Sequence, residues 1–249
     1  MSRPLILGGT TEASLLARAC AEAGLPAILS YAGRVDNPRP QPVETRVGGF
    51  GGVEGLAAWM RDHAITHLVD ATHPFAAQMS ANAVGAAKLT GIPLIAFERA
   101  PWAVEPGDRW TSVADMAGAV AALDRPAIRV FLAIGRLNLE DFAIRPQHHY
   151  LLRLVDPPEG PLPFPDCAVV VARGPFRFED DLTLLKEQAI DCVVAKNAGG
   201  DGARAKIDAA RALGLEVILI DRPYVPDRPV ARTLDDVMAF LGHDADLGV

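Results

Sequence analysis

The feature that most constrains the fold is a repeated order of apolar strand, glycine turn and helix, first seen in residues 4–12. Leu5, Ile6 and Leu7 form a short apolar run without polar alternation, as expected for a strand buried on both faces of a parallel sheet. Two glycines then permit a sharp turn, and the residues after them suit the start of a helix. The N–H groups at such a helix start can bind an anion. The loop is therefore either a phosphate cradle for a nucleotide or an ordinary tight turn. Its residues are Gly8, Gly9, Thr10, Thr11 and Glu12.

The same order recurs in segments that begin near His67 and Cys192. Repeated βαβ units imply parallel sheets with helices on both faces. The sequence thus predicts an α/β protein with two Rossmann-like parallel-sheet domains that face each other across a cleft. The best break in the pattern is at residues 124–126, so we expect domains at 1–126 and 127–249. A cofactor on the first and a substrate on the second is the natural arrangement.

The overall composition excludes several classes of protein. A chain of 249 residues that is half hydrophobic can bury a large core, and its net charge of −7 argues against a general nucleic-acid binder. No apolar run reaches the ~18–20 residues of a membrane span, and the early first strand leaves no room for a signal peptide. The three cysteines and six histidines show no metal-ligand spacing. We therefore expect a cytoplasmic protein with reduced thiols, no metal site and no membrane partner.

The end of the second predicted strand bears on the choice of cofactor. In a nucleotide-binding βαβ unit this end meets the adenosine ribose, where an acid favours NADH and a base accommodates the 2′-phosphate of NADPH. This chain has a basic residue there and no acid, so NADPH is favoured if a nucleotide binds. The alternative is a polar loop with no special role. The residues concerned are Ser30, Tyr31, Gly33 and Arg34.

A polar cluster follows the predicted strand 66–71, at an end where α/β sheets bind their ligands. Asp70 and Thr72 are expected on the nicotinamide side of the site. His73 could hydrogen-bond substrate or cofactor, or donate a proton, although a lone histidine is more often a positioning or capping residue. Tyr31 is the second candidate proton donor.

A second glycine-rich loop, within residues 191–206, follows another apolar strand. Its lysines and free N–H groups could hold a phosphate or a carboxylate through charge-assisted hydrogen bonds. The alternatives are contact with the cofactor across the cleft, or a flexible turn with solvated lysines. Together with two arginines that follow other predicted strands, the expected substrate-binding residues are His73, Arg136, Arg173, Lys196, Asn197, Gly199, Gly200 and Lys206.

Four motifs in sequence order carry a family resemblance. They are Gly-Gly-Thr-Thr-Glu-Ala at 8–13, Ser-Tyr-Ala-Gly-Arg at 30–34, Asp-Ala-Thr-His-Pro-Phe-Ala at 70–76 and Lys-Asn-Ala-Gly-Gly at 196–200. Over essentially its whole length the chain resembles the precorrin-6A reductase family. The resemblance implies NADPH-dependent reduction of precorrin-6A, or its cobalt counterpart, to precorrin-6B in cobalamin biosynthesis. It also implies hydride transfer from the nicotinamide to a polycarboxylate tetrapyrrole, with transient contacts to neighbouring pathway enzymes.

Two other classes stay open on the residues alone. One is another NADPH-dependent reductase or a sugar-nucleotide enzyme of Rossmann type, although no tyrosine is followed by the Tyr-x-x-x-Lys spacing of short-chain reductases. The other is a two-lobed binding protein of periplasmic type without catalysis. Failure to bind NADPH would favour that second class.

Overall fold

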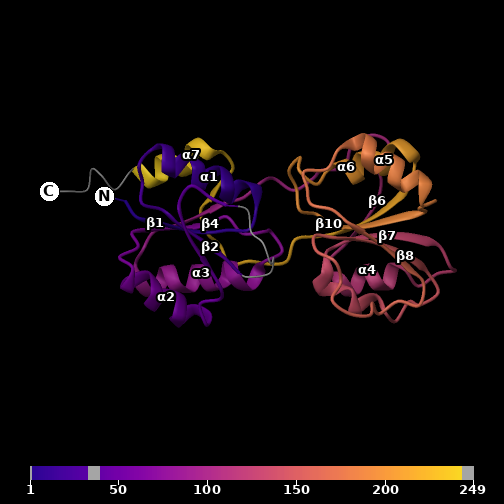
Figure 1. The fold of residues 1–249 in the computed structure, drawn as a ribbon, viewed down its shortest axis with the longest axis horizontal. Coiled ribbons are helices and arrows are strands. Elements are labelled where there is room, and N and C mark those ends of the chain that lie inside the picture. Colours follow the sequence, from indigo (N-terminus) through magenta and orange to yellow (C-terminus); the bar gives the residue numbers. More distant parts are fainter. Residues whose placement is uncertain (1, 33–39, 243–249) are drawn as a thin grey trace. The chain divides into compact units, whose positions relative to one another are not determined.

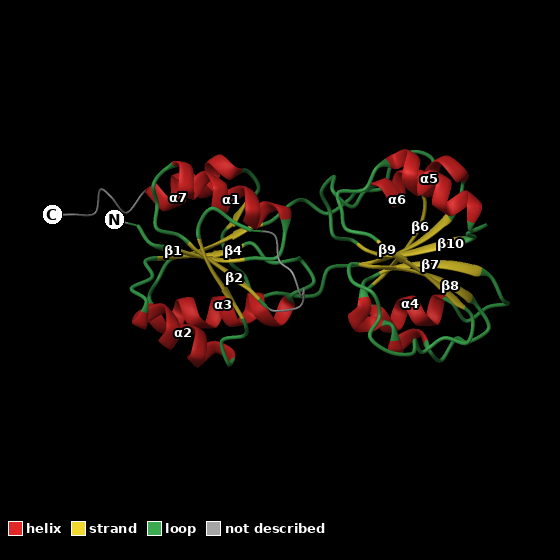
Figure 2. Cartoon of the chain, in the orientation of Figure 1, coloured by secondary structure: helices red, strands yellow, loops and turns green. Residues whose placement is uncertain are grey.

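The computed structural model of the protein describes residues 2–32 and 40–242. The predicted cofactor residues Gly33 and Arg34 lie outside this part of the chain. Two compact units are present (Figure 1), one formed by Met1–Ala100 with Tyr224–Val249 and the other by Pro101–Pro223. Each unit has a parallel sheet with helices on both faces (Figure 2), which confirms the predicted α/β class with two Rossmann-like domains.

The described part of the first unit contains six parallel strands in the order β12-β5-β4-β1-β2-β3. Strands β1 and β5 are buried along their whole length, which explains their uninterrupted apolar sequences. Because β1 pairs with β2 on one side and β4 on the other, the strand order reverses between β1 and β4. The bounds are β1 Pro4–Leu7, β2 Ile28–Tyr31, β3 Glu44–Val47, β4 His67–Asp70, β5 Leu94–Phe97 and β12 Val230–Ala231.

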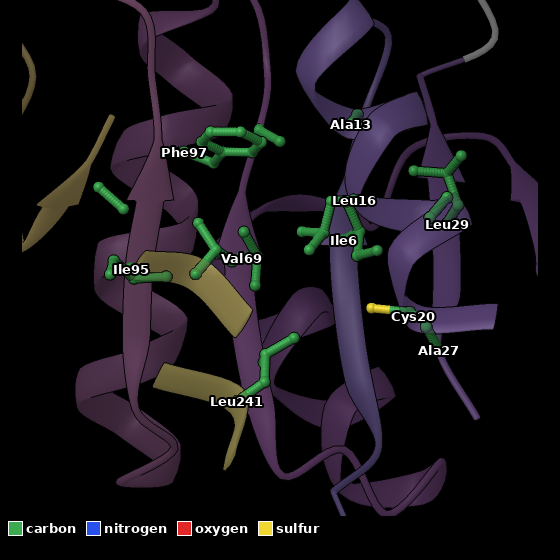
Figure 3. Close-up of a cluster of buried hydrophobic side chains, with 14 residues drawn as sticks. Ile6, Ala13, Leu16, Cys20, Ala27, Leu29, Val69, Ile95, Phe97 and Leu241 are labelled. Carbon is green, nitrogen blue, oxygen red and sulfur yellow. The ribbon is translucent and has the colours of Figure 1, made fainter. Parts of the chain in front are cut away.

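Helices cover both faces of this sheet (Figures 1 and 2). Helices α1 (Thr11–Glu22) and α7 (Leu234–Gly242) lie on one face, and α2 (Gly52–Asp62) and α3 (Ala77–Thr90) lie on the other. Figure 3 shows Leu241 of α7 within the same buried cluster as Ile6, Leu16 and Val69. The C-terminal segment therefore completes the core of the first unit.

Residues 101–223, all of them described, form a second six-stranded parallel sheet with the order β6-β11-β10-β7-β8-β9. Helix α4 (Met116–Ala122) lies on one face and α5 (Phe178–Glu187) with α6 (Ala205–Leu213) on the other (Figure 1). The strand order again reverses, here between β7 and β10. The remaining bounds are β6 Arg109–Val113, β7 Arg129–Ala133, η1 Arg136–Asn138, η2 Glu140–Phe142, β8 His149–Leu154, β9 Cys167–Val171, β10 Cys192–Lys196 and β11 Glu216–Ile220.

The division of the chain differs from the predicted boundary at residue 126. Strand β6 pairs in parallel with β11 and so belongs to the second unit, whereas β12 pairs with β5 of the first. Arg125, placed at the predicted break, is ion-paired with Glu216 at 2.6 Å between Nη1 and Oε2. In each unit one edge strand, β12 in the first and β6 in the second, lies outside the run of consecutive βαβ segments. A search for local repeats cannot detect such a strand. The cleft between the domains stays a prediction.

Within residues 2–32 and 40–242, no helix is long and apolar enough to span a membrane. In the same ranges, no group of three or more histidine, cysteine or acidic side chains is placed to hold a metal ion.

Candidate functional site

The reversal point of the first sheet brings together the loops that follow β1 and β4. Leu7 pairs in register with Asp70, so both loops emerge at the same edge of the sheet. Thr10 Oγ1 donates to the Ala71 carbonyl oxygen at 2.7 Å, which joins the two loops directly. The Gly8 amide donates to the Ser30 carbonyl at 2.9 Å and adds the end of β2. Three of the predicted cofactor segments therefore meet at one edge, where open α/β sheets bind their ligands.

The turn after β1 depends on its two glycines. A Cβ at Gly8 would lie 2.5 Å from Leu29 Cδ1, so a side chain there would force the core to shift. Gly9 has a φ of +116°, and a Cβ built on it would meet no atom within 4 Å. Open space thus lies beside the turn. Thr10 caps α1 by accepting from the Ala13 amide at 3.2 Å, which leaves the N–H groups of the first two helical residues at the helix start.

The position of the third glycine of the dinucleotide fingerprint is occupied by Glu12. Its carboxylate Oε2 lies 2.8 Å from Arg99 Nη1, and both side chains are about four-fifths buried. Arg99 follows strand β5 closely in sequence. The acidic residue in the loop therefore carries its own counter-charge.

A basic residue, Arg46, lies beside the end of β2, on the neighbouring strand β3. The sequence analysis did not identify it. Arg46 of β3 lies in register with the buried Ser30 and donates from Nη1 to its Oγ at 2.8 Å. It also donates to the carbonyls of Gly48 and Gly49 at 2.9 and 3.1 Å, and its guanidinium lies 3.8 Å from the Phe50 ring centroid. Burial lowers the pKa of Arg46, but a guanidinium stays protonated in a protein. Arg46 was missed because only the pairing of β3 with β2 places it beside Ser30, 16 positions earlier in the chain.

The phenol group of Tyr31 forms hydrogen bonds with the side chains of Gln41 and Ser14 in the same unit. Partial burial raises the pKa of Tyr31 more than its hydrogen bonds with Gln41 and Ser14 lower it. The phenol is therefore protonated at neutral pH and can act as a donor. Its catalytic role stays a prediction.

Asp70 shapes the loop after β4. Its buried carboxylate Oδ1 accepts from the Thr72 amide at 3.2 Å and from Thr72 Oγ1 at 2.7 Å. Its other oxygen, Oδ2, lies 3.5 Å from Arg228 Nε, and Arg228 also pairs with Glu98 at 3.0 Å. The carboxylate of Asp70 thus holds Thr72 and the returning C-terminal segment in place.

His73 is part of the turn that leads into α3. Its Nδ1 accepts from the Phe75 amide at 3.2 Å, which places the ring proton of a neutral imidazole on Nε2. The His73 carbonyl accepts from the Ala76 amide at 2.7 Å. This geometry agrees with the positioning role that the sequence left open, and a role as proton donor stays a prediction.

In the second unit, Asn197 and the glycine turn close around Trp102. Asn197 Oδ1 accepts from the Trp102 amide at 2.8 Å, and its Nδ2 donates to the Trp102 carbonyl at 3.2 Å. The Trp102 indole Nε1 donates to the Gly200 carbonyl at 2.8 Å. Gly199 and Gly200 both have positive φ, near +70°, so the turn requires them. The amide of Asn197 therefore serves the loop's own structure.

The predicted cations of the second unit differ in their placement. Lys206 is buried; its Nζ donates to the Ala203 carbonyl and lies 5.0 Å from the Trp102 ring centroid, which favours a structural role. Lys196 Nζ donates to Asn138 Oδ1 at 3.0 Å and so joins the end of β10 to η1, which follows β7. Arg136, after β7, forms an exposed ion pair with Glu159 at 3.9 Å. Arg173, after β9, pairs with Asp156 at 3.5 Å, and both of these side chains are about one-third exposed.

A buried ion pair in the second unit was also missed. Arg153 of β8 pairs bidentately with Asp181 of α5, and both side chains are less than one-tenth exposed. The Arg153 guanidinium lies 4.8 Å from the Phe131 ring centroid and 4.2 Å from that of Phe176. Asp181 follows Glu179 and Asp180 in the first turn of α5, so the sequence alone does not distinguish the buried carboxylate from its two exposed neighbours.

The cysteines are free, as predicted. Burial raises the pKa of Cys20 to about 11 and that of Cys192 to about 12. Because only a thiolate attacks or binds metal, these two thiols are inert at neutral pH.

The fold and the strand-end loops define a two-domain, doubly wound α/β protein with a glycine turn at the reversal point of its first sheet. The chain belongs to the precorrin-6x reductase CbiJ/CobK family, whose model matches residues 3–242. The family resemblance of the four motifs is thereby confirmed. Membership makes the chain an oxidoreductase of cobalamin biosynthesis.

Individual relatives agree with the family assignment. The chain is 61% identical over 241 residues to the precorrin-6A reductase of Rhodobacter capsulatus, covering 97% of this chain and 96% of the relative. It is 31% identical over 252 residues to the cobalt-precorrin-6A reductase of Priestia megaterium, covering 95% and 97%. A solved structure of CobK precorrin-6A reductase superimposes with a TM-score of 0.95 at 60% identity, covering 98% of this chain and 97% of that one.

Proposed function

We propose that this chain reduces precorrin-6A to precorrin-6B and takes the hydride from NADPH bound to its first unit. The observation that carries the cofactor assignment is the β1–β4 reversal point, where a glycine turn, a helix start and Arg46 share one sheet edge. When bound, a reduced nicotinamide supplies the hydride, and the protein's part is to hold donor and acceptor in place.

The residues of the first unit fit a dinucleotide in a defined order along the sheet edge. The glycine turn and the α1 start would bind the pyrophosphate, because the open space at Gly9 allows close approach to the backbone. Ser30 of β2 and Arg46 of the neighbouring strand β3 would bind the ribose 2′-phosphate. The loop of Thr72 and His73 would line the nicotinamide side.

The second unit would bind the substrate. A tetrapyrrole that carries acetate and propionate groups needs separated cations, and the net charge of the chain is negative. Arg136 and Arg173 follow β7 and β9, and Lys196 is the last residue of β10, so their charges are spread along the carboxyl edge of the second sheet. The reduction also needs a proton, for which His73 and Tyr31 are candidates beside solvent and the ring nitrogens.

The proposed function is tested by following loss of the reduced-nicotinamide absorbance with precorrin-6A and with its cobalt form, each with NADPH and NADH. Consumption that depends on a precorrin and prefers NADPH is expected. Tight NADPH binding without consumption would favour a different reductase. Absence of nucleotide binding would favour a two-lobed binding protein.

Replacing Arg46 by methionine is expected to raise the KM for NADPH by roughly 10- to 100-fold and to change the KM for NADH little. The side-chain length is kept, but the charge-assisted hydrogen bonds to a 2′-phosphate, about 1.5–3 kcal/mol, are lost. Steady-state kinetics with both cofactors measures the effect. Arg61→Ala is the control, since Arg61 lies in the last turn of α2 and donates to the Leu89 carbonyl. Equal losses with NADH and NADPH would remove the 2′-phosphate role of Arg46.

A further inference from the structure

The first turn of α1 combines two features that conflict electrostatically. The helix start and the glycine turn suit the pyrophosphate of the proposed cofactor, yet Glu12 places a carboxylate in that same turn. A pyrophosphate and a carboxylate repel each other at short range, and most of this carboxylate is shielded from water, which reduces screening. A pyrophosphate therefore binds beside Glu12 more tightly when the charge of the Glu12 carboxylate is offset.

Arg99 supplies that offset. Its Nη1 lies 2.8 Å from Glu12 Oε2, and the two side chains retain only 20% and 18% of their exposure. The pair joins residues 87 positions apart, from the segment after β5 to the start of α1. An acid at a helix start is favourable on its own, so α1 does not require Arg99 as a cap.

We infer that Arg99 is a positioning residue for the cofactor loop: it holds the Glu12 carboxylate and cancels its charge, so that the loop accepts a pyrophosphate. This inference rests on the proposed function, because it concerns how the same loop binds NADPH. Glu12 stands where the dinucleotide fingerprint has its third glycine, and Arg99, its ion-pair partner, is not part of that fingerprint. The positioning role also differs from a direct contact, in which Arg99 would leave Glu12 and bind the phosphate itself.

The test is NADPH binding, followed by nucleotide fluorescence at low and high salt, for the full-length chain and five variants. The variants are Arg99→Ala, Arg99→Lys, Glu12→Gln, the double variant Arg99→Ala/Glu12→Gln, and Arg61→Ala as control. Thermal unfolding of each variant shows whether it is folded.

Arg99→Ala is expected to raise the Kd for NADPH about tenfold, because the Glu12 charge is then uncompensated. The double variant should bind within about threefold of wild type, since neither charge remains, and Arg99→Lys should do the same. Added salt should weaken binding less in Arg99→Ala than in wild type, because it also screens the repulsion. Arg61→Ala should match wild type. A purely structural role would show neither the rescue nor the altered salt dependence.

A double variant as weak as Arg99→Ala would overturn the inference and favour a direct phosphate contact or a structural role. An Arg99→Ala variant that binds like wild type would overturn it as well. Wild-type protein that binds no NADPH would instead remove the proposed function, and this inference with it. The two failures are therefore distinguishable.

Discussion

Removal of residues 224–249 is expected to unfold the first unit and to leave the second folded. The deletion takes away β12, which pairs with β5, and α7, whose Val237 and Leu241 are fully buried in the core beneath α1. Burial of each such side chain contributes about 1.5–3 kcal/mol. The side chains that pack against it would be exposed to water by the deletion, which adds a similar loss of buried apolar area. The total approaches the 5–15 kcal/mol that stabilises a typical domain.

Hydrogen exchange resolved by residue measures this outcome. Amides of β1 and β4 should lose protection in the truncated chain, whereas amides of β7 and β10 should keep it. Removal of residues 243–249 alone is the control, because it leaves α7 whole. A domain boundary at residue 126 predicts the opposite, with damage confined to the second unit. Retained protection in β1 would therefore contradict the division described above.

The parts of the fold that sequence predicted correctly are those with local signals. The turn from β1 into α1 and the turn after β10 are each determined by consecutive residues, so the sequence predicts both of them. The unit to which the edge strands β6 and β12 belong is not predicted by such a signal. Strand β12 has two residues and β6 is mostly exposed, so neither shows a buried apolar run. Their places are fixed only by pairing with β5 and β11, far away in sequence.

The candidate site shows the same limit at the level of side chains. The sequence identified Lys206 as a cation beside a glycine loop, but the side chain is buried, and its Nζ lies 5.0 Å from the ring centroid of Trp102, which is distant in sequence. Arg46 was overlooked because its role arises from register pairing with Ser30 across two strands. A residue type at a strand end predicts which chemistry is available, whereas long-range packing decides whether the side chain faces the ligand or the protein.

Replacing Asp181 by alanine is expected to destabilise the second unit by about 3–5 kcal/mol, the cost of leaving a buried charge without its partner. Arg153 would then be uncompensated in a site that is more than nine-tenths buried and lined by Phe131 and Phe176. Urea unfolding followed by the fluorescence of the second unit's tryptophans, Trp102 and Trp110, measures the loss.

Two comparison variants separate the charge effect from general damage. Arg153→Met/Asp181→Leu removes both charges at similar volume and is expected to lose far less stability than Asp181→Ala, because no unpaired charge remains. Glu159→Ala removes the acid of an exposed pair, at 3.9 Å from Arg136, and should cost no more than about 1 kcal/mol. If Asp181→Ala costs no more than Glu159→Ala, the buried pair does not stabilise the unit. If the first unit binds NADPH as proposed, binding should persist in all three variants under conditions where they are folded, because that unit has its own core and contains the proposed cofactor loop.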